Sequence, residues 1–181
     1  MRDAVSIETT HRGRLFRVDV LAYTDENGRD VTREVVRHPG AVVIVPVLGA
    51  DRLVLIRNYR IAVDDRLWEL PAGKLEPGED PQHAAGRELQ EETGHRADRI
   101  RPLGSFFTSP GFADEIIHAF IAEDLTFVGQ SLEPGEEIEA AELDVAEVLA
   151  MIADGCIRDG KTIAAVLMWH QQQAGQGRDA E

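Results

Sequence analysis

Three glutamates within about one turn of a predicted helix constrain this chain more than any other feature. The helix is expected to run from Pro81 to Thr93, because Asp80 is a typical N-cap, proline is favoured in the first turn and Gly94 is a typical stop. At about 3.6 residues per turn, side chains three and four positions apart project from one face. The glutamates at this spacing are Glu88, Glu91 and Glu92.

Such a helix face is unfavourable on its own, because like charges at this spacing repel by a few tenths of a kcal/mol per pair. A cation between the carboxylates would remove the repulsion. Mg²⁺ prefers hard oxygen ligands and commonly bridges carboxylates and substrate phosphates. On spacing alone, a solvent-facing acidic helix is the alternative, since Glu is a common surface helix former.

The overall charge argues against nucleic acid as a partner. The 181 residues carry a formal net charge of -14, whereas a polyanion is bound by clustered Lys and Arg.

The longest apolar run, Ala41 to Leu48, is too short for a membrane span of about 20 helical residues. The single cysteine, Cys156, excludes an intrachain disulfide, and residues 1–12 lack the apolar core of a signal peptide, so we expect a cytoplasmic protein.

Apolar periodicity predicts several strands with helices interspersed. An antiparallel hairpin is expected around Asn27-Gly28, a strong turn signal. Its strands would cover 14–24 and 31–37, with further strands at 41–47, 52–57, 101–108 and 115–122, and further helices at 145–153 and 162–173. This order predicts a layered α/β or α+β sandwich. A doubly wound nucleotide fold is disfavoured, because the chain has neither a Gly-x-Gly-x-x-Gly motif after a strand nor a Walker loop.

A longer pattern surrounds the glutamate helix: Gly73, five residues, Glu79, seven residues, Arg87-Glu88-Leu89, one residue, Glu91-Glu92, one residue and Gly94. It resembles the Nudix box at every fixed polar and glycine position. The final hydrophobic position of the family pattern is occupied by His95, so different local packing is expected after the helix. The resemblance implies a Nudix α/β/α sandwich with a mixed sheet, preceded by the N-terminal antiparallel hairpin.

The resemblance also assigns a metal site to this helix. The ligands of Mg²⁺, or alternatively of Mn²⁺, would be Glu88, Glu91, Glu92 and the backbone carbonyl of Ala72. Glu79 and Arg87 would orient these ligands, and Arg87 and Glu91 would count among the catalytic residues.

Two other segments resemble the ADP-ribose pyrophosphatase branch of the family. Ser109-Pro110-Gly111 looks like its substrate loop, with Pro110 sixteen residues after Gly94, and Glu115 would contact substrate; alone, this motif would indicate only a turn. Arg57-Asn58-Tyr59-Arg60 resembles the segment that supplies a phosphate-contacting arginine. Arg60 is preferred because a guanidinium can bind phosphate oxygens bidentately, and Arg57 is a further substrate-binding candidate. A surface arginine ending a strand is the alternative.

The general base is expected in the Glu-rich segment 133–139. The resemblance implies that a loop carboxylate approaches the attacking water only when substrate and metals are bound. Glu136 is preferred, and Glu133 and Glu137 are close alternatives because one sequence does not fix the register. An ordinary solvated loop is the other interpretation.

The resemblance divides the chain into two parts. Residues 1–38 would form the hairpin that serves dimerisation or strand exchange, and residues 39–181 would form the Nudix domain. Enzymes of this branch are homodimers whose N-terminal strands exchange between subunits and help to form the adenine site. Phe16, Tyr59 and Trp68 would then be stacking surfaces for the base, or else core residues.

The predicted function is hydrolysis of the pyrophosphate bond of ADP-ribose to AMP and ribose 5-phosphate, which makes a small nucleoside diphosphate the expected partner. The nearest alternative is hydrolysis of another nucleotide sugar such as GDP-mannose, because a similar Ser-Pro-Gly loop occurs in such enzymes. The other alternative is a nucleotide-sensing module that binds without cleaving, which the retained carboxylates disfavour.

Overall fold

The computed structural model describes residues 6–132 and 135–176, and its centre is a mixed seven-stranded sheet. The sheet has the order β10-β5-β4-β9-β8, while β6 pairs with β5 and β7 pairs with β4. The strands are β4 (Ala41–Leu48), β5 (Arg52–Arg60), β6 (Asp65–Glu69), β7 (Ala72–Lys74), β8 (His95–Phe107), β9 (Ile116–Phe127) and β10 (Ile138–Asp144). β4 and β9 run parallel, and the other pairs are antiparallel.

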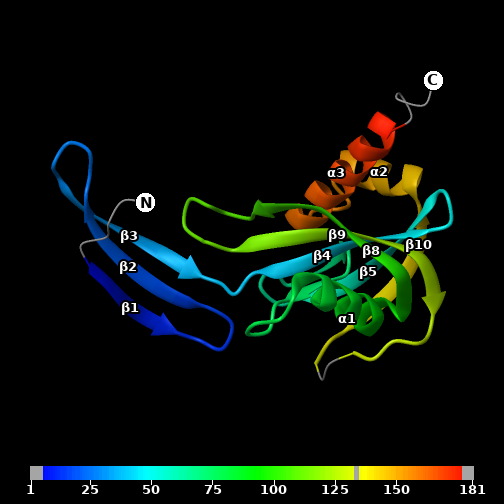
Figure 1. Ribbon diagram of the computed structural model, residues 1–181, viewed down its shortest axis with the longest axis horizontal. Helices are drawn as coiled ribbons and strands as arrows, with labels where there is room; N and C mark the ends of the chain where they lie inside the picture. Colours follow the sequence, from blue (N-terminus) through cyan, green and yellow to red (C-terminus); the bar gives the residue numbers. More distant parts are fainter. Residues whose placement is uncertain (1–5, 133–134, 177–181) are drawn as a thin grey trace.

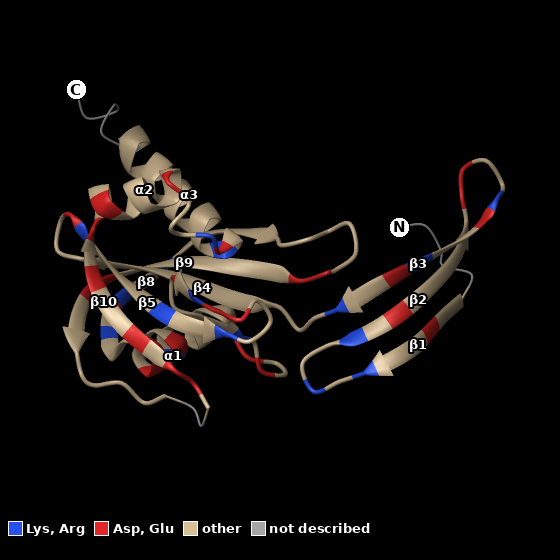
Figure 2. Cartoon of the chain, turned by 180° about the vertical axis from the view of Figure 1, so that it is seen from behind, with Lys and Arg blue, Asp and Glu red and all other residues tan. Residues whose placement is uncertain are grey.

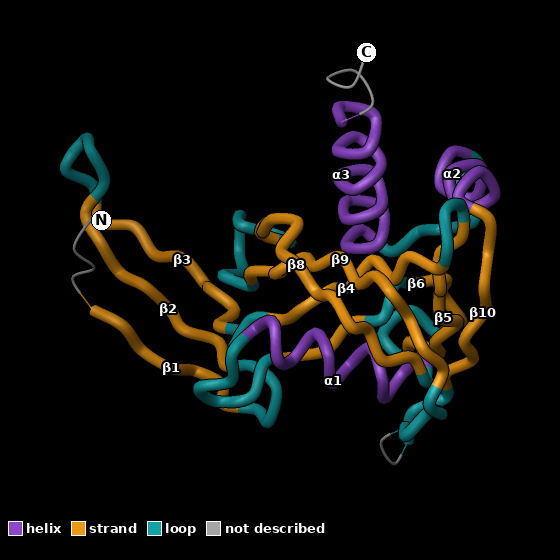
Figure 3. Tube along the Cα trace, turned by 45° about the vertical axis from the view of Figure 1, so that its right-hand side comes forward, coloured by secondary structure: helices purple, strands orange, loops and turns teal. Residues whose placement is uncertain are grey.

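Helices cover both faces of this sheet (Figures 1 and 3). The helix α1 (Pro81–Thr93) lies on one face, and α2 (Val145–Ala153) and α3 (Gly160–Gln176) lie on the other. The central strand β4 is an apolar run because it is buried on both sides. Alternate residues of β4 join two separate cores, which confirms the expected α/β/α sandwich with a mixed sheet.

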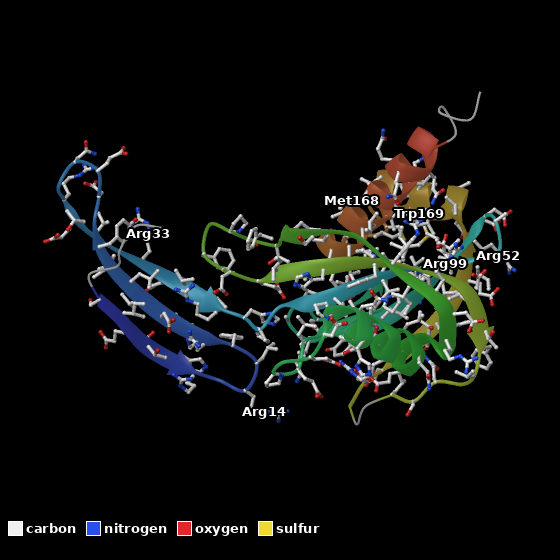
Figure 4. All side chains as sticks on the ribbon, viewed as in Figure 1. Arg14, Arg33, Arg52, Arg99, Met168 and Trp169 are labelled. Atoms are coloured by element: carbon white, nitrogen blue, oxygen red, sulfur yellow. The ribbon has the colours of Figure 1, made fainter. Side chains whose placement is uncertain are left out.

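The two cores follow from the alternation of side chains along a strand. Val43 and Val45 pack with Trp169 of α3, which Figure 4 labels, whereas Val42 and Ile44 pack against α1. On the α1 side the partners are Ala84, Ala85 and Leu89, all with no exposed surface. The apolar side of α1 therefore holds the helix on the sheet and leaves its glutamates on another side.

The ends of α1 agree with the sequence signals. The side chain of Asp80 accepts hydrogen bonds from the backbone N–H groups of Gln82 and His83, and Gly94 adopts the left-handed conformation with φ of 74°. The predicted bounds of α1 and of the helix 145–153 are confirmed, while α3 begins two residues earlier and ends three residues later than expected.

Four strands were not predicted: β1, β6, β7 and β10. The compositions of three of them explain why. β1 (Ser6–Arg12) is exposed at all seven positions, so it has no buried apolar alternation. β7 has only three residues and lies inside the expected loop 71–79. β10 carries Glu139 and Glu142, and part of it was interpreted as the Glu-rich loop. Figure 2 shows acidic positions of β10 beside basic positions of β5, and the register pairs Glu139 with Arg57.

The N-terminal hairpin is confirmed, with β1 added as a third strand. β2 (Arg17–Thr24) pairs with β3 (Asp30–Arg37), and β1 pairs with β2. This small sheet projects from one end of the main body (Figure 1). Its contacts with the body include two backbone hydrogen bonds, from Val36 N–H to the Phe112 carbonyl and from Asp114 N–H to the Val36 carbonyl.

The segment after β9 is docked on the C-terminal end of α1. The carbonyl of Gly94 accepts hydrogen bonds from the N–H groups of Val128 and Gly129, and Ser131 N–H donates to the Glu91 carbonyl. A side chain at position 94 would lie 2.7 Å from Phe127 and 2.9 Å from the backbone nitrogen of Gln130. Glycine is therefore required here both for the positive φ and for this close approach.

No helix in residues 6–132 and 135–176 is long and apolar enough to cross a membrane.

Candidate active site

A cleft of about 820 Å³ opens where the exposed side of α1 meets the ends of several strands. α1 contributes Arg87, Glu88 and Glu92 to its wall. Ala72 and Gly73 of β7 lie directly beside the α1 glutamates, and residues of β5, the end of β8 and the first residues of α3 complete the lining. Its volume falls within the range of about 300–1,000 Å³ that is common for small-molecule sites.

Arg87 connects the acidic side chains of the box. Its guanidinium donates to Glu79 Oε1 at 3.1 Å, to Glu88 Oε1 at 2.7 Å and to Glu91 Oε2 at 3.0 Å. The hydrogen bond from Arg87 lowers the pKa of Glu79 to about 2, so this carboxylate is ionised at neutral pH. The structure thus brings together the residues that were expected to orient the metal ligands.

Glu88 and Glu92 are buried carboxylates. Burial raises the pKa of Glu92 to about 8, although a hydrogen bond of 2.8 Å from the Ala72 N–H to Glu92 Oε2 acts in the opposite direction. Burial also raises the pKa of Glu88, and the neighbouring carboxylates Glu91 and Glu136 add to this shift. Burying two acidic groups side by side costs free energy unless positive charge compensates them.

Gly73 makes room for Glu88. A Cβ atom at position 73 would lie only 1.9 Å from Glu88 Oε1 and 2.0 Å from its carboxyl carbon. Any side chain at this position would therefore displace the carboxylate, which is the physical reason for glycine at the start of the box.

The donor set of this wall suits a hard divalent cation. It consists of carboxylate oxygens on one helix face and the adjacent backbone of Ala72, and two of the carboxyls are buried. In the described parts of the chain, however, no three acidic, His or Cys side chains converge closely enough to hold an ion as they stand. In this arrangement Arg87 engages one oxygen of each carboxylate, Glu88 Oε1 and Glu91 Oε2.

Arg60 and Arg57 have different surroundings. Arg60 lines the cleft and forms a bidentate pair with the buried Glu69, at 2.7 and 2.6 Å. Arg57 is exposed and does not line the cleft, and its guanidinium lies 5.9 Å from the ring centre of Trp68. Alternating side chains on β5 explain why a separation of three residues places the two arginines apart.

The predicted substrate loop reaches the cleft through Glu115. Glu115 Oε2 accepts a hydrogen bond of 2.8 Å from Thr108, and Oε1 lies 3.4 Å from His38 Nδ1. Pro110 and Gly111 do not line the cleft.

The carboxylates predicted as alternative bases also have different surroundings. Glu136 lines the cleft and is close enough to Glu88 and Glu92 to raise the pKa of both. Glu137 is exposed and pairs with Arg66 at 2.6 Å. Glu133 lies outside the described residues.

The aromatic candidates and His95 have distinct positions. Tyr59 lines the cleft, whereas Trp68 packs against the core and Phe16 is exposed beside Leu15, which itself lines the cleft. His95 is buried and makes an edge-to-face contact with Phe127, with ring centres 5.4 Å apart. The position that is hydrophobic in the family pattern is thus filled here by a histidine packed against an aromatic ring.

Sequence reasoning identified Arg60 but missed the charged cluster to which it belongs. The Glu69 cluster, as we call it, consists of Arg60, Glu69, Asp159 and Lys161. Glu69 lies within the apolar run Leu67–Leu70, and a charged residue in such a run is a signal of a buried ionic contact. Its partner on α3, Lys161, could not be identified, because it is 92 residues away in the sequence.

Comparison with known proteins agrees with this geometry. A model of the NUDIX domain matches residues 37–166. The chain belongs to the Nudix family. It is 40% identical to a methanol dehydrogenase activator of Bacillus methanolicus, over 94% of this chain and 93% of that protein. It is 37% identical to an ADP-ribose pyrophosphatase of Bacillus subtilis, over 84% of this chain and 83% of the relative, which confirms the resemblance to that branch.

The chain is also similar to a GDP-mannose pyrophosphatase and to a solved structure. A GDP-mannose pyrophosphatase of Klebsiella pneumoniae subsp. pneumoniae is 37% identical, over 77% of this chain and 73% of the relative. A solved structure described as an ADP compounds hydrolase superimposes with a TM-score of 0.86 at 26% identity, and the match covers 98% of this chain and 97% of that chain. The likeness of the whole chain to this structure includes the N-terminal sheet.

Proposed function

We propose that this Nudix chain hydrolyses the pyrophosphate bond of ADP-ribose to AMP and ribose 5-phosphate with the help of divalent cations. The observation that carries the proposal is a single cleft with buried glutamates of α1 on one wall and Arg60 on the other. Anionic oxygens of a diphosphate can bridge a cation held by carboxylates and a guanidinium. The identity to ADP-ribose pyrophosphatases supports the choice of substrate.

In the proposed reaction, water attacks one phosphorus and the bond from that phosphorus to the bridging oxygen breaks. Arg60 binds a phosphate of the substrate, Glu115 contacts it from the substrate loop, and Glu136 accepts the proton of the attacking water. Arg87 holds Glu88 and Glu91 in position. Glu88, Glu91, Glu92 and the Ala72 carbonyl would hold Mg²⁺ or Mn²⁺, which would supply neutralising charge and increase the acidity of water.

A panel of nucleoside diphosphate derivatives tests this function. With Mg²⁺ or Mn²⁺, we expect ADP-ribose to give AMP and ribose 5-phosphate in equal amounts, with a higher kcat/KM than the other substrates and no turnover in EDTA. The products are measured by chromatography. Binding of ADP-ribose without turnover in either metal would instead indicate a sensing module.

GDP-mannose is the second candidate substrate, because a GDP-mannose pyrophosphatase is as similar in identity as the ADP-ribose enzymes. The same panel separates the two. A kcat/KM for GDP-mannose equal to or above that for ADP-ribose would replace the first proposal with this one.

We also propose that residues 1–38 form a dimerisation element. β1 is the exposed outer strand of the projecting sheet, and Ile7, Leu15 and Phe16 are exposed apolar residues of the same region. An open strand edge with apolar neighbours is a favourable site for a second copy. Light scattering is expected to give twice the chain mass of 20.0 kDa, and the mass of one chain at assay concentrations would contradict the proposal.

A further inference from the structure

Glu69 is a buried carboxylate that contacts two cations in the wall of the cleft opposite α1. It has no exposed surface, and Lys161 Nζ donates to its Oε2 at 2.6 Å. Arg60 donates to both of its oxygens. Burial opposes ionisation of Glu69, but the hydrogen bond from Arg60 and the charge of Lys161 lower its pKa, so the carboxylate is ionised.

The pairing uses one defined edge of the Arg60 guanidinium. Nε and Nη2 donate to Glu69, and Nη1 makes no hydrogen bond to any residue in the part of the chain that the structure describes. Because the guanidinium is planar, fixing the Nε and Nη2 edge also fixes where the two N–H groups of Nη1 lie. Arg60 lines the cleft, and its charge interacts with Glu92 on the opposite wall. Nη1 is thus the part of Arg60 available to a bound anion.

Lys161 fixes Glu69 from the other side. Its ammonium bridges Glu69 and Asp159, which lies 2.9 Å away. Asp159 Oδ2 accepts hydrogen bonds from both the N–H and the hydroxyl of Thr162, and the Thr162 hydroxyl oxygen accepts one from Leu70 N–H. The start of α3 is therefore bonded to the residue directly after Glu69. Without Lys161, the Glu69 carboxylate would lose one of the two cations that define its plane.

We infer that Glu69 and Lys161 are positioning residues, which hold Arg60 so that its Nη1 meets a phosphate of the substrate diphosphate. The inference rests on the proposed function, in which Arg60 contacts that phosphate. Lys161 acts through Glu69 and Arg60, and its own charge is shared between Glu69 and Asp159.

A double-mutant cycle tests this inference on the full chain. Lys161→Met is made in the wild type and in Arg60→Met, and kcat and KM are measured for the best substrate of the panel. In the wild-type background we expect kcat/KM to fall by about ten- to a hundredfold, the scale on which misplaced binding groups affect catalysis. In the Arg60→Met background we expect less than about a twofold further loss, because the residue being positioned is already absent.

Several controls separate the outcomes. Lys161→Arg, which keeps the positive charge, should recover most of the lost activity. Arg52→Met removes one cation from an exposed pair with Glu142 far from the cleft, and its kcat/KM should equal that of the wild type. Figure 4 labels Arg52 at the end of the body opposite the N-terminal sheet. If Lys161→Met does not fold, Lys161→Gln carries the same comparison, because it also removes the positive charge beside Glu69.

Equal losses from Lys161→Met in both backgrounds would overturn the inference, since Lys161 would then act independently of Arg60. Unchanged kcat/KM in Lys161→Met would overturn it as well. Failure of the proposed function gives a different result: Arg60→Met itself would have no effect on kcat/KM.

Discussion

Glu92→Gln is expected to reduce kcat/KM at least about a hundredfold, because a bound divalent cation contributes several kcal/mol to transition-state stabilisation and Glu92 is one of its proposed ligands. Glutamine is nearly isosteric, and its side-chain oxygen can still accept the hydrogen bond from the Ala72 N–H. The fold should therefore persist. Steady-state kinetics across a Mg²⁺ titration measures the loss, and activity equal to the wild type would contradict the ligand assignment.

The same substitution has a pH signature in melting experiments. The pKa of Glu92 is about 8 in the fold and 4.5 in a model peptide, so the fold favours the protonated form. Its contribution to stability is complete below about pH 4.5 and is lost as pH rises towards 8. In EDTA, the Tm of the wild type should fall more over this window than the Tm of Glu92→Gln. Mg²⁺ should recover the loss in the wild type only.

Glu136→Gln is expected to lower kcat by about 10²- to 10⁴-fold, the usual contribution of a general base, with a smaller change in KM. The residue lines the cleft close to Glu88 and Glu92. Single-turnover kinetics would locate the loss in the chemical step.

Glu137→Gln provides the matched control for this prediction. It removes the neighbouring carboxylate, which is exposed and bonded to Arg66. We expect its kcat to remain within about twofold of the wild type, since an exposed ion pair contributes little. A large loss in Glu137→Gln together with normal kcat in Glu136→Gln would assign the base to Glu137 instead.

Local signals explain what could be predicted from the sequence. The bounds of α1 follow from Asp80, Pro81 and Gly94, whose preferences depend on backbone geometry within a few residues. The acidic face follows from helical spacing alone. The box pattern extends over one continuous segment, so its loop, helix and glycine requirements could be identified together without knowledge of tertiary contacts.

Other parts of the site depend on contacts between distant segments. Nothing near Glu69 in the sequence indicates that Lys161 will reach it, and nothing near Glu136 distinguishes it from Glu137. The strand β1 gains its structure by pairing with β2 and buries none of its side chains, so apolar periodicity cannot reveal it. These features require the three-dimensional arrangement.

The docking of residues 128–131 on the end of α1 has a consequence for how sites of this kind can diversify. Glu136 lies between two attached points of the chain. On one side, Ser131 N–H is bonded to the carbonyl of Glu91, and on the other, the strand β10 begins at Ile138. The reach of Glu136 is consequently set by the number of residues between two fixed attachments, one of which belongs to the carboxylate helix itself. Insertions or deletions between them can change the distance from the proposed base to the scissile bond without altering the acidic face of α1.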